Sequence, residues 1–159
     1  MAGAFEEQVA LFRLYQELRD DLMNLLTDEA LVYQPGGAAP TLGSLCREIG
    51  ETEQSYLESF ATLRQDFSYR HPDPAIDHSV ARLTAWYAEL DAALASTLGA
   101  LTPEALDNDV IDRGGGFEVS LPLQLEIYKE ALLIFYGKAS VYVKALGMEV
   151  PGRWQRWIG

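Results

Sequence analysis

The stretch that decides the fold is Leu121–Leu146, LPLQLEIYKEALLIFYGKASVYVKAL. Ser120 precedes it as a candidate N-cap, and Gly147 follows it at the place where a left-handed residue would end a helix. Its apolar residues recur at alternating steps of four and three, which places them on one helix face. They are Leu121, Leu125, Tyr128, Leu132, Phe135, Ala139, Tyr142 and Leu146. This spacing predicts a long helix that lies along the seam of a bundle.

A second apolar stripe runs beside the first on the same segment and consists of Ile127, Ala131, Ile134, Val141 and Ala145. Together the two stripes make the helix apolar nearly all round between Ala131 and Tyr136. A helix with this pattern is usually covered on more than one side. We therefore expect this helix to be central either to the fold or to a dimer.

Three further amphipathic helices precede this segment. The same spacing predicts helices over 5–26, 42–67 and 80–101, with a short turn at 28–31. Thr27, Thr41 and either Asp77 or Ser79 are candidate caps. Prolines and glycines at 34–40 and 71–74 interrupt the pattern. The stripe expected for the first helix is Leu11, Leu14, Leu18, Leu22 and Leu25.

The remaining segments are short. Thr102 and Pro103 read as a cap and a first-turn proline, and residues 110–111 and 117–119 can pair as a small hairpin around Gly114–Gly116. No lysine and hydroxyl residue follow these glycines in P-loop spacing, so a flexible turn is favoured over a phosphate cradle. The sequence thus predicts an all-α protein, a four-helix bundle forming one domain over 1–159. We expect the tail, 148–159, to pack its tryptophans on the bundle, with an oligomer contact as the alternative.

The composition argues against several functional classes. The chain has 159 residues and a formal net charge of -12, which disfavours nucleic acid and anionic lipid as partners. No apolar run approaches the ~20 residues of a membrane span, and no basic region precedes an apolar run as in a secretory signal. The single cysteine, Cys46, lies in a helical pattern and is expected to be a buried structural thiol. These features predict a cytoplasmic protein.

Few residues suggest chemistry. His71 and His78 lie in the proline-bearing loop with Asp73 and Asp77, where they offer a weak alternative metal site without a defined ligand spacing. Exposed loop histidines are the simpler interpretation. Glu48 is an acidic residue beside a predicted apolar stripe, and its side chain lies either on the flank of that stripe or inward toward the last helix.

Several short motifs resemble the DinB/YfiT-like bundle proteins. They are Leu26–Leu31 (LTDEAL), Thr41–Glu53 (TLGSLCREIGETE), Tyr136–Lys138 (YGK) and Val143–Pro151 (VKALGMEVP). The resemblance extends over nearly the whole chain and implies the same four-helix fold. Proteins of that family typically hold a divalent metal with three histidines, one on the second helix and two in an H-x-x-x-H pair on the fourth.

In this sequence, the positions that the resemblance matches to the three histidines are occupied by Glu48, Ala131 and Phe135. Alanine and phenylalanine have no donor atom, so the resemblance argues against the family's metal, and we expect no cofactor. The residues expected to line the former metal cleft are Glu48, Thr52, Tyr128, Ala131 and Phe135.

We therefore expect a homodimeric small-molecule-binding or interaction protein, with a role in stress or detoxification. Whether it is an enzyme stays open. The alternative is an enzyme similar to the family's thiol-dependent S-transferases, with Glu48, Tyr128 and Thr52 at the reacting groups.

Overall fold

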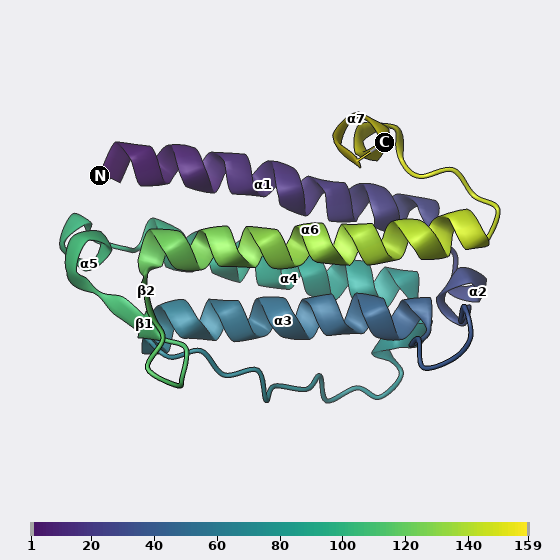
Figure 1. Ribbon diagram of the computed structural model, residues 1–159, viewed down its shortest axis with the longest axis horizontal. Helices are drawn as coiled ribbons and strands as arrows, with labels where there is room; N and C mark the ends of the chain where they lie inside the picture. Colours follow the sequence, from purple (N-terminus) through teal and green to yellow (C-terminus); the bar gives the residue numbers. More distant parts are fainter. Residues whose placement is uncertain (1, 159) are drawn as a thin grey trace.

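A computed structural model describes residues 2–158. Four long helices run side by side as a bundle: α1 (Ala2–Leu25), α3 (Leu42–Thr62), α4 (Val80–Gly99) and α6 (Leu121–Ala145). Short elements connect them: α2 (Asp28–Leu31), η1 (Ile76–His78), α5 (Pro103–Asn108), β1 (Val110–Asp112), β2 (Glu118–Ser120) and α7 (Gly152–Ile158). In Figure 1, α6 lies in front of α4, between α1 and α3. The expected all-α four-helix bundle with a small hairpin is confirmed.

The helix starts follow from side-chain capping. In each of five helices a hydroxyl side chain accepts a hydrogen bond from the backbone N–H three residues on, which satisfies a donor that the helix itself leaves free. The five capping residues are Thr27, Thr41, Ser79, Thr102 and Ser120. Gly147 has a φ of 74° after the end of α6. These predicted boundaries are therefore confirmed.

Helix α3 ends five residues earlier than its apolar stripe predicted. Leu63 adopts a left-handed conformation, with a φ of 57°, and the chain leaves the helix toward the hairpin. The carbonyl oxygen of Leu63 accepts from the N–H of Asp112 at 3.0 Å, and the N–H of Gln65 donates to the carbonyl oxygen of Asp112 at 2.8 Å. Pairing with β1 replaces the last predicted turn, so Phe67 lies in the connection to η1 rather than in a helix.

The first helix also differs from its predicted face. Leu11 and Leu14 are exposed, whereas Phe12, Arg19 and Met23 are buried. The buried face of α1 is thus rotated from the leucine repeat, and it carries polar as well as apolar side chains.

Helix α6 buries its first stripe, except that Leu146 is half-buried, and leaves the second stripe largely uncovered. Ile134 and Val141 are exposed. Within the single chain the other helices therefore cover only the first stripe, and the alternative that a dimer covers the second stripe stays a prediction.

The C-terminal tail folds back on the bundle. Trp154 of α7 is buried and donates from Nε1 to the carbonyl oxygen of Leu18 at 2.8 Å. Trp157 is exposed and contacts the ring of Tyr15 edge-on, at 5.0 Å between ring centroids. Both tryptophans of α7 thus contact α1, although only Trp154 enters the core. Among the described helices, none is both long and apolar enough to cross a membrane.

Candidate functional site

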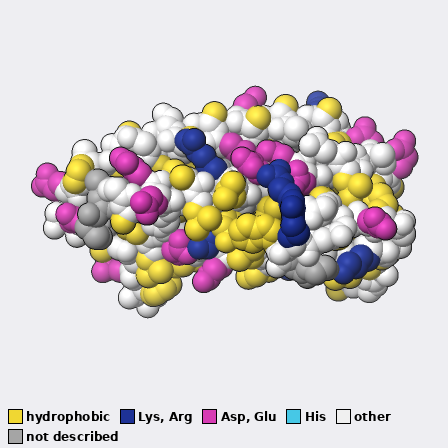
Figure 2. Space-filling view, turned by 90° about the horizontal axis from the view of Figure 1, so that it is seen from above, with side chains coloured by type: hydrophobic (Ala, Val, Ile, Leu, Met, Phe, Trp, Pro, Cys, Tyr) yellow, Lys and Arg dark blue, Asp and Glu magenta, His cyan; other side chains and the backbone are white. Residues whose placement is uncertain are grey.

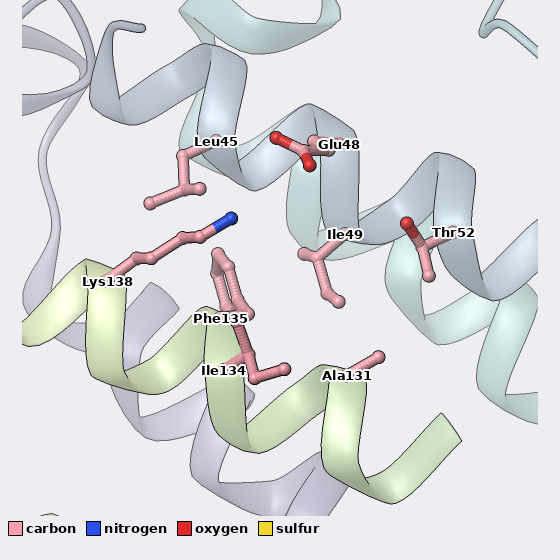
Figure 3. A pocket seen from close by; sticks show the side chains of 8 residues that line it. All are labelled: Leu45, Glu48, Ile49, Thr52, Ala131, Ile134, Phe135 and Lys138. Atoms are coloured by element: carbon pink, nitrogen blue, oxygen red, sulfur yellow. The ribbon is translucent and has the colours of Figure 1, made fainter. Parts of the chain in front are cut away.

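A hollow opens between α3 and α6, at the place where the sequence predicted a cleft. It has a volume of about 150 Å³. Its floor and walls are mostly apolar, and its lining residues point toward one another from the two helices (Figure 3). They are Leu45, Glu48, Ile49, Thr52, Ala131, Ile134, Phe135 and Lys138.

A second hollow adjoins the first and shares Glu48 and Thr52 with it. Its volume is about 300 Å³, and Phe67 and Arg70 form its outer wall. These two residues belong to the connection that runs back along α3 in Figure 1. The two hollows together form one groove, which we call the α3 groove, apolar at its α6 end and polar at the other.

At the polar end of the α3 groove, Glu51 links α3 to the connection that follows it. Its carboxylate accepts from Arg47 at 2.8 Å and from the backbone N–H of His71 at 3.0 Å. These bonds tie the connection to α3. The charge of Glu51 is therefore already compensated, so it is a structural element of the wall.

Glu48 and Lys138 stand on opposite sides of the first hollow, and both are exposed. In Figure 3 the amino group of Lys138 extends across the hollow toward α3. Within residues 2–158, neither side chain forms an ion pair within 4 Å. The rim of the groove thus presents one negative and one positive group that are free to meet a ligand.

Four of the five predicted cleft residues come together: Glu48, Thr52, Ala131 and Phe135 line the first hollow. Tyr128 does not. It is fully buried and stacks on Tyr56, with 4.6 Å between ring centroids. It shares the helix stripe with Phe135 but points to the bundle axis, so the prediction was wrong for this side chain.

The three family metal positions do not fit a metal. Ala131 and Phe135 supply no donor atom, and Glu48 supplies a single exposed carboxylate. Within the described part of the chain, no three His, Cys, Asp or Glu side chains come together in a way that could hold a metal ion.

The two loop histidines differ in their contacts and in their exposure to solvent. His71 packs on Trp86 at 4.4 Å between ring centroids, and its Nδ1 accepts from the N–H of Asp73 at 3.1 Å. His78 is exposed beside Asp77. One ring nitrogen of His71 is therefore engaged by the backbone, which does not favour the loop metal site.

The sequence interpretation missed a polar cluster inside the bundle. Arg19 of α1 and Glu53 of α3 are both fully buried and form an ion pair. Arg19 also contacts Asp91 of α4 at 2.6 Å, and Gln16 donates to the same carboxylate at 2.6 Å. The Arg19 guanidinium lies 4.0 Å from the ring centre of Tyr87. Three of the four long helices are thus joined through this cluster.

Burial controls the protonation of this cluster. Desolvation raises the pKa of Glu53 to about 7, against the opposing pull of the Arg19 charge. It also raises the pKa of Tyr128, and the nearby Glu53 charge raises it further. Two buried atoms here, Nε of Arg19 and the hydroxyl of Tyr128, have no hydrogen-bond partner among residues 2–158. One signal for the cluster was present in the sequence, because Glu53 follows Ile49 by four residues and precedes Tyr56 by three, which is the spacing of a core position.

A sequence model of the DinB superfamily matches residues 12–125. The chain belongs to the DinB superfamily. Among solved structures it is similar to a DinB-like protein of Bacillus subtilis, YjoA, with a TM-score of 0.71 and 17% identity, over 91% of this chain and 96% of that one. At this identity the likeness shows the fold alone. No match was found among curated protein sequences.

The superfamily match ends at Leu125, within the first turns of α6. It therefore includes Glu48 but not Ala131 or Phe135. The assignment of those two positions to the DinB histidines depends on the sequence resemblance and on their shared place in the α3 groove.

Proposed function

We propose that this DinB protein binds a small amphipathic molecule in the α3 groove, without the three-histidine metal of its family. The observation that carries the proposal is the groove itself, in which an apolar hollow adjoins a polar one and both share Glu48. Ligand sites are commonly concave and mostly apolar, with a few polar groups that fix orientation. A role in stress or detoxification would follow from the capture of such molecules.

The volume limits the ligand. An apolar cavity of about 150 Å³ accommodates a molecule of the size of benzene, so the first hollow suits one ring or a short alkyl chain. A longer ligand would extend past Thr52 into the second hollow. Because Glu48 has no partner in the described residues, a cationic or hydrogen-donating group at the ligand's polar end would meet an available carboxylate.

Benzylamine and benzyl alcohol are matched probes for this site, because they differ in charge and share the ring. In amide-detected NMR titrations, both should shift the signals of Thr52, Ala131 and Phe135, and benzylamine should bind more tightly. Glu48→Gln should weaken benzylamine binding by about two- to fivefold, the range for an exposed ion pair, and leave the alcohol unchanged.

Glu58→Gln is the control, because Glu58 is exposed on the same helix and lies outside both hollows. Shifts confined to residues away from the groove would refute the binding site. A separate measurement tests the proposal that the protein holds no metal at this site. Stoichiometric zinc, nickel or iron in protein purified without added metal would refute it if the metal were lost in Glu48→Gln.

An S-transferase-like activity is the second candidate, favoured by the solvent-open groove with Glu48 and Thr52 at its centre. In such a reaction the thiol loses its proton, a sulfur–carbon bond forms and a halide leaves the electrophile. The burial of Tyr128 removes one of the three residues expected to assist. An assay of glutathione conjugation with a chlorinated nitrobenzene tests this candidate. If it is correct, the wild-type protein turns over these substrates, and the rate falls in Glu48→Gln but not in Glu58→Gln.

A further inference from the structure

Arg113, in the turn between β1 and β2, is held in place by neutral groups. Its Nη1 donates to the side-chain oxygen of Gln124 at 2.6 Å, and its Nη2 donates to the hydroxyl of Tyr56 at 3.5 Å. The guanidinium carbon lies 5.5 Å from the ring centre of Tyr56 and 5.9 Å from that of Phe67. Aromatic faces attract a cation without neutralising it. These partners therefore fix Arg113 and leave its positive charge uncompensated.

Gln124 of α6 is itself locked by buried polar side chains, so it presents its oxygen to Arg113. Its Nε2 donates to Oγ of Ser59 at 2.8 Å and to Oε1 of Gln65 at 2.6 Å. Gln124, Ser59 and Gln65 all belong to the buried polar residues of the bundle. Buried polar groups are costly unless they are hydrogen-bonded. The fold thus maintains a polar network whose outer acceptor positions the guanidinium of Arg113.

The neighbours of Arg113 supply no counter-charge. Burial raises the pKa of Tyr56, against the opposing effect of the Arg113 charge, so the Tyr56 hydroxyl stays protonated at neutral pH. Asp112, the preceding residue, accepts from the N–H of Gly114 at 2.7 Å. Among residues 2–158, Arg113 forms no ion pair within 4 Å. In a chain with 24 acidic and 12 basic residues, a fixed arginine without a carboxylate is unexpected.

Arg153 shows the ordinary arrangement on this acidic surface. It contacts both Glu17 and Asp21 at 2.7 Å, and in the middle of the face shown in Figure 2 a basic side chain lies directly against acidic ones. Arg64 lies at the same end of the bundle as Arg113, but its side chain is exposed. Arg113 differs from both, because it is half-buried and ordered by neutral partners.

A ligand can reach Arg113 beside Phe67. Phe67 is 48% exposed, and it also belongs to the outer wall of the second hollow. In Figure 1 the turn that carries Arg113 stands at the outer edge of the bundle, beside α3. Within the described residues, no atom lies within 4 Å of the positions where side chains would begin at 114–116. The guanidinium is therefore accessible next to an exposed aromatic ring.

We propose that Arg113 binds the carboxylate of a small aromatic acid whose ring packs on Phe67. A guanidinium carries more N–H donors than its bonds to Gln124 and Tyr56 use, and its planar fork matches a carboxylate. Phe67 offers the ring contact, since aromatic pairs add to the free energy of burial. The site adjoins the α3 groove across Phe67, but it does not depend on the ligand proposed for that groove.

Phenylacetate and phenylacetamide are matched probes, because they share the ring and differ in charge. In amide-detected NMR titrations, phenylacetate should shift the signals of Phe67 and of residues 113–117, and phenylacetamide should bind at least about tenfold more weakly, the range for hydrogen bonds to charged groups. Acetate lacks the ring and should also bind more weakly than phenylacetate. Equal binding of phenylacetate and phenylacetamide would overturn the proposal, and equal binding of acetate would refute the contact with Phe67.

Substitutions assign the effect to Arg113. Arg113→Gln should weaken phenylacetate binding by about tenfold or more, and Arg113→Lys should also weaken it, because lysine keeps the charge but not the planar fork. Arg64→Gln is the control of equal charge change and should bind like wild type. Circular dichroism verifies that each variant is folded. Unchanged binding in Arg113→Gln, or an equal loss in Arg64→Gln, would refute the site.

The outcome is separable from the test of the α3 groove. Benzyl alcohol reports on the first hollow through Thr52, Ala131 and Phe135, whereas phenylacetate reports on Arg113 and Phe67. If benzyl alcohol binds and phenylacetate does not shift the turn, the carboxylate site alone is refuted. If phenylacetate binds at Arg113 and benzyl alcohol binds nowhere, the carboxylate site is supported and the groove proposal fails.

Discussion

Replacement of Arg19 by methionine should strongly destabilise the protein, because it removes the positive partner of a carboxylate that water cannot reach. Arg19 and Glu53 are both fully buried. Without the guanidinium, the one side-chain hydrogen bond left to Glu53 within the described part of the chain is the bond from Gln16 at 3.3 Å. Breaking a buried ion pair from one side costs about 3–5 kcal/mol. For a protein of this size that corresponds to a fall in melting temperature of roughly 6–20 °C.

The loss of unfolding free energy in Arg19→Met should be larger at high pH than at low pH. The pKa of Glu53 is already raised from 4.5 to about 7 by burial, and the Arg19 charge acts to lower it. In Arg19→Met this pKa should rise further. A carboxyl group whose pKa is higher in the folded than in the unfolded state lowers the free energy of unfolding progressively as pH rises from the unfolded pKa to the folded pKa, and above the folded pKa the cost is constant. Below about 4.5 it is protonated in both states and the effect vanishes. The cost should therefore be largest at pH 8 and shrink toward pH 5.

Urea unfolding at both pH values measures the change, with Arg82→Met as the control. Arg82 pairs with Asp73 at 2.9 Å but is exposed, so its loss should cost less than about 1 kcal/mol. Adding Glu53→Leu to Arg19→Met removes the stranded charge and should recover part of the stability. A cost below 1 kcal/mol at pH 8, or a double variant as unstable as the sum of the two single changes, would refute this reasoning.

Three further predictions test other parts of the fold. Gly43→Ala should lower the free energy of unfolding by about 1–3 kcal/mol, because a side chain there would overlap a neighbouring backbone carbonyl oxygen. In Gly99→Ala the new side chain meets open space, so the free energy of unfolding should change by less than about 0.5 kcal/mol. Urea titrations of the two variants measure this difference. Burial raises the pKa of Cys46 to about 12, so the native thiol should react with Ellman's reagent far more slowly than the urea-unfolded chain, and equal rates would contradict its burial. Trp154→Ala should cost about 3–5 kcal/mol in thermal unfolding, and Trp157→Ala much less, because only Trp154 fills the core; equal effects would mean that α7 is not anchored as described.

The sequence was sufficient for those features that depend on neighbours along the chain. Thr41 and Ser120 cap the helices that they were expected to cap, because a hydroxyl three residues before an N–H has the right reach in any context. The alternating apolar steps of α6 predicted its buried face for the same reason. Glu48, Thr52, Ala131 and Phe135 were placed around one cleft by combining this periodicity with a family resemblance, and they line one hollow.

The departures occur where distant segments compete with local preference. Local spacing would continue α3 to Phe67, but the backbone at Leu63 pairs with β1, which lies far along the sequence. Leucine spacing on α1 favoured Leu11 and Leu14, but the buried face includes Arg19 because Glu53 and Asp91 on other helices compensate its charge.

The sequence by itself thus determined the helices, their caps and the membership of the bundle, since these depend on periodicity and short-range hydrogen bonds. Only the tertiary structure decided which polar residues are buried, where the groove opens and which apolar stripe stays uncovered. A charge can enter the core only when a partner from another helix reaches it, and a stripe is exposed only when no helix packs on it. Both conditions depend on the relative positions of whole helices, to which residues far apart in the sequence contribute together.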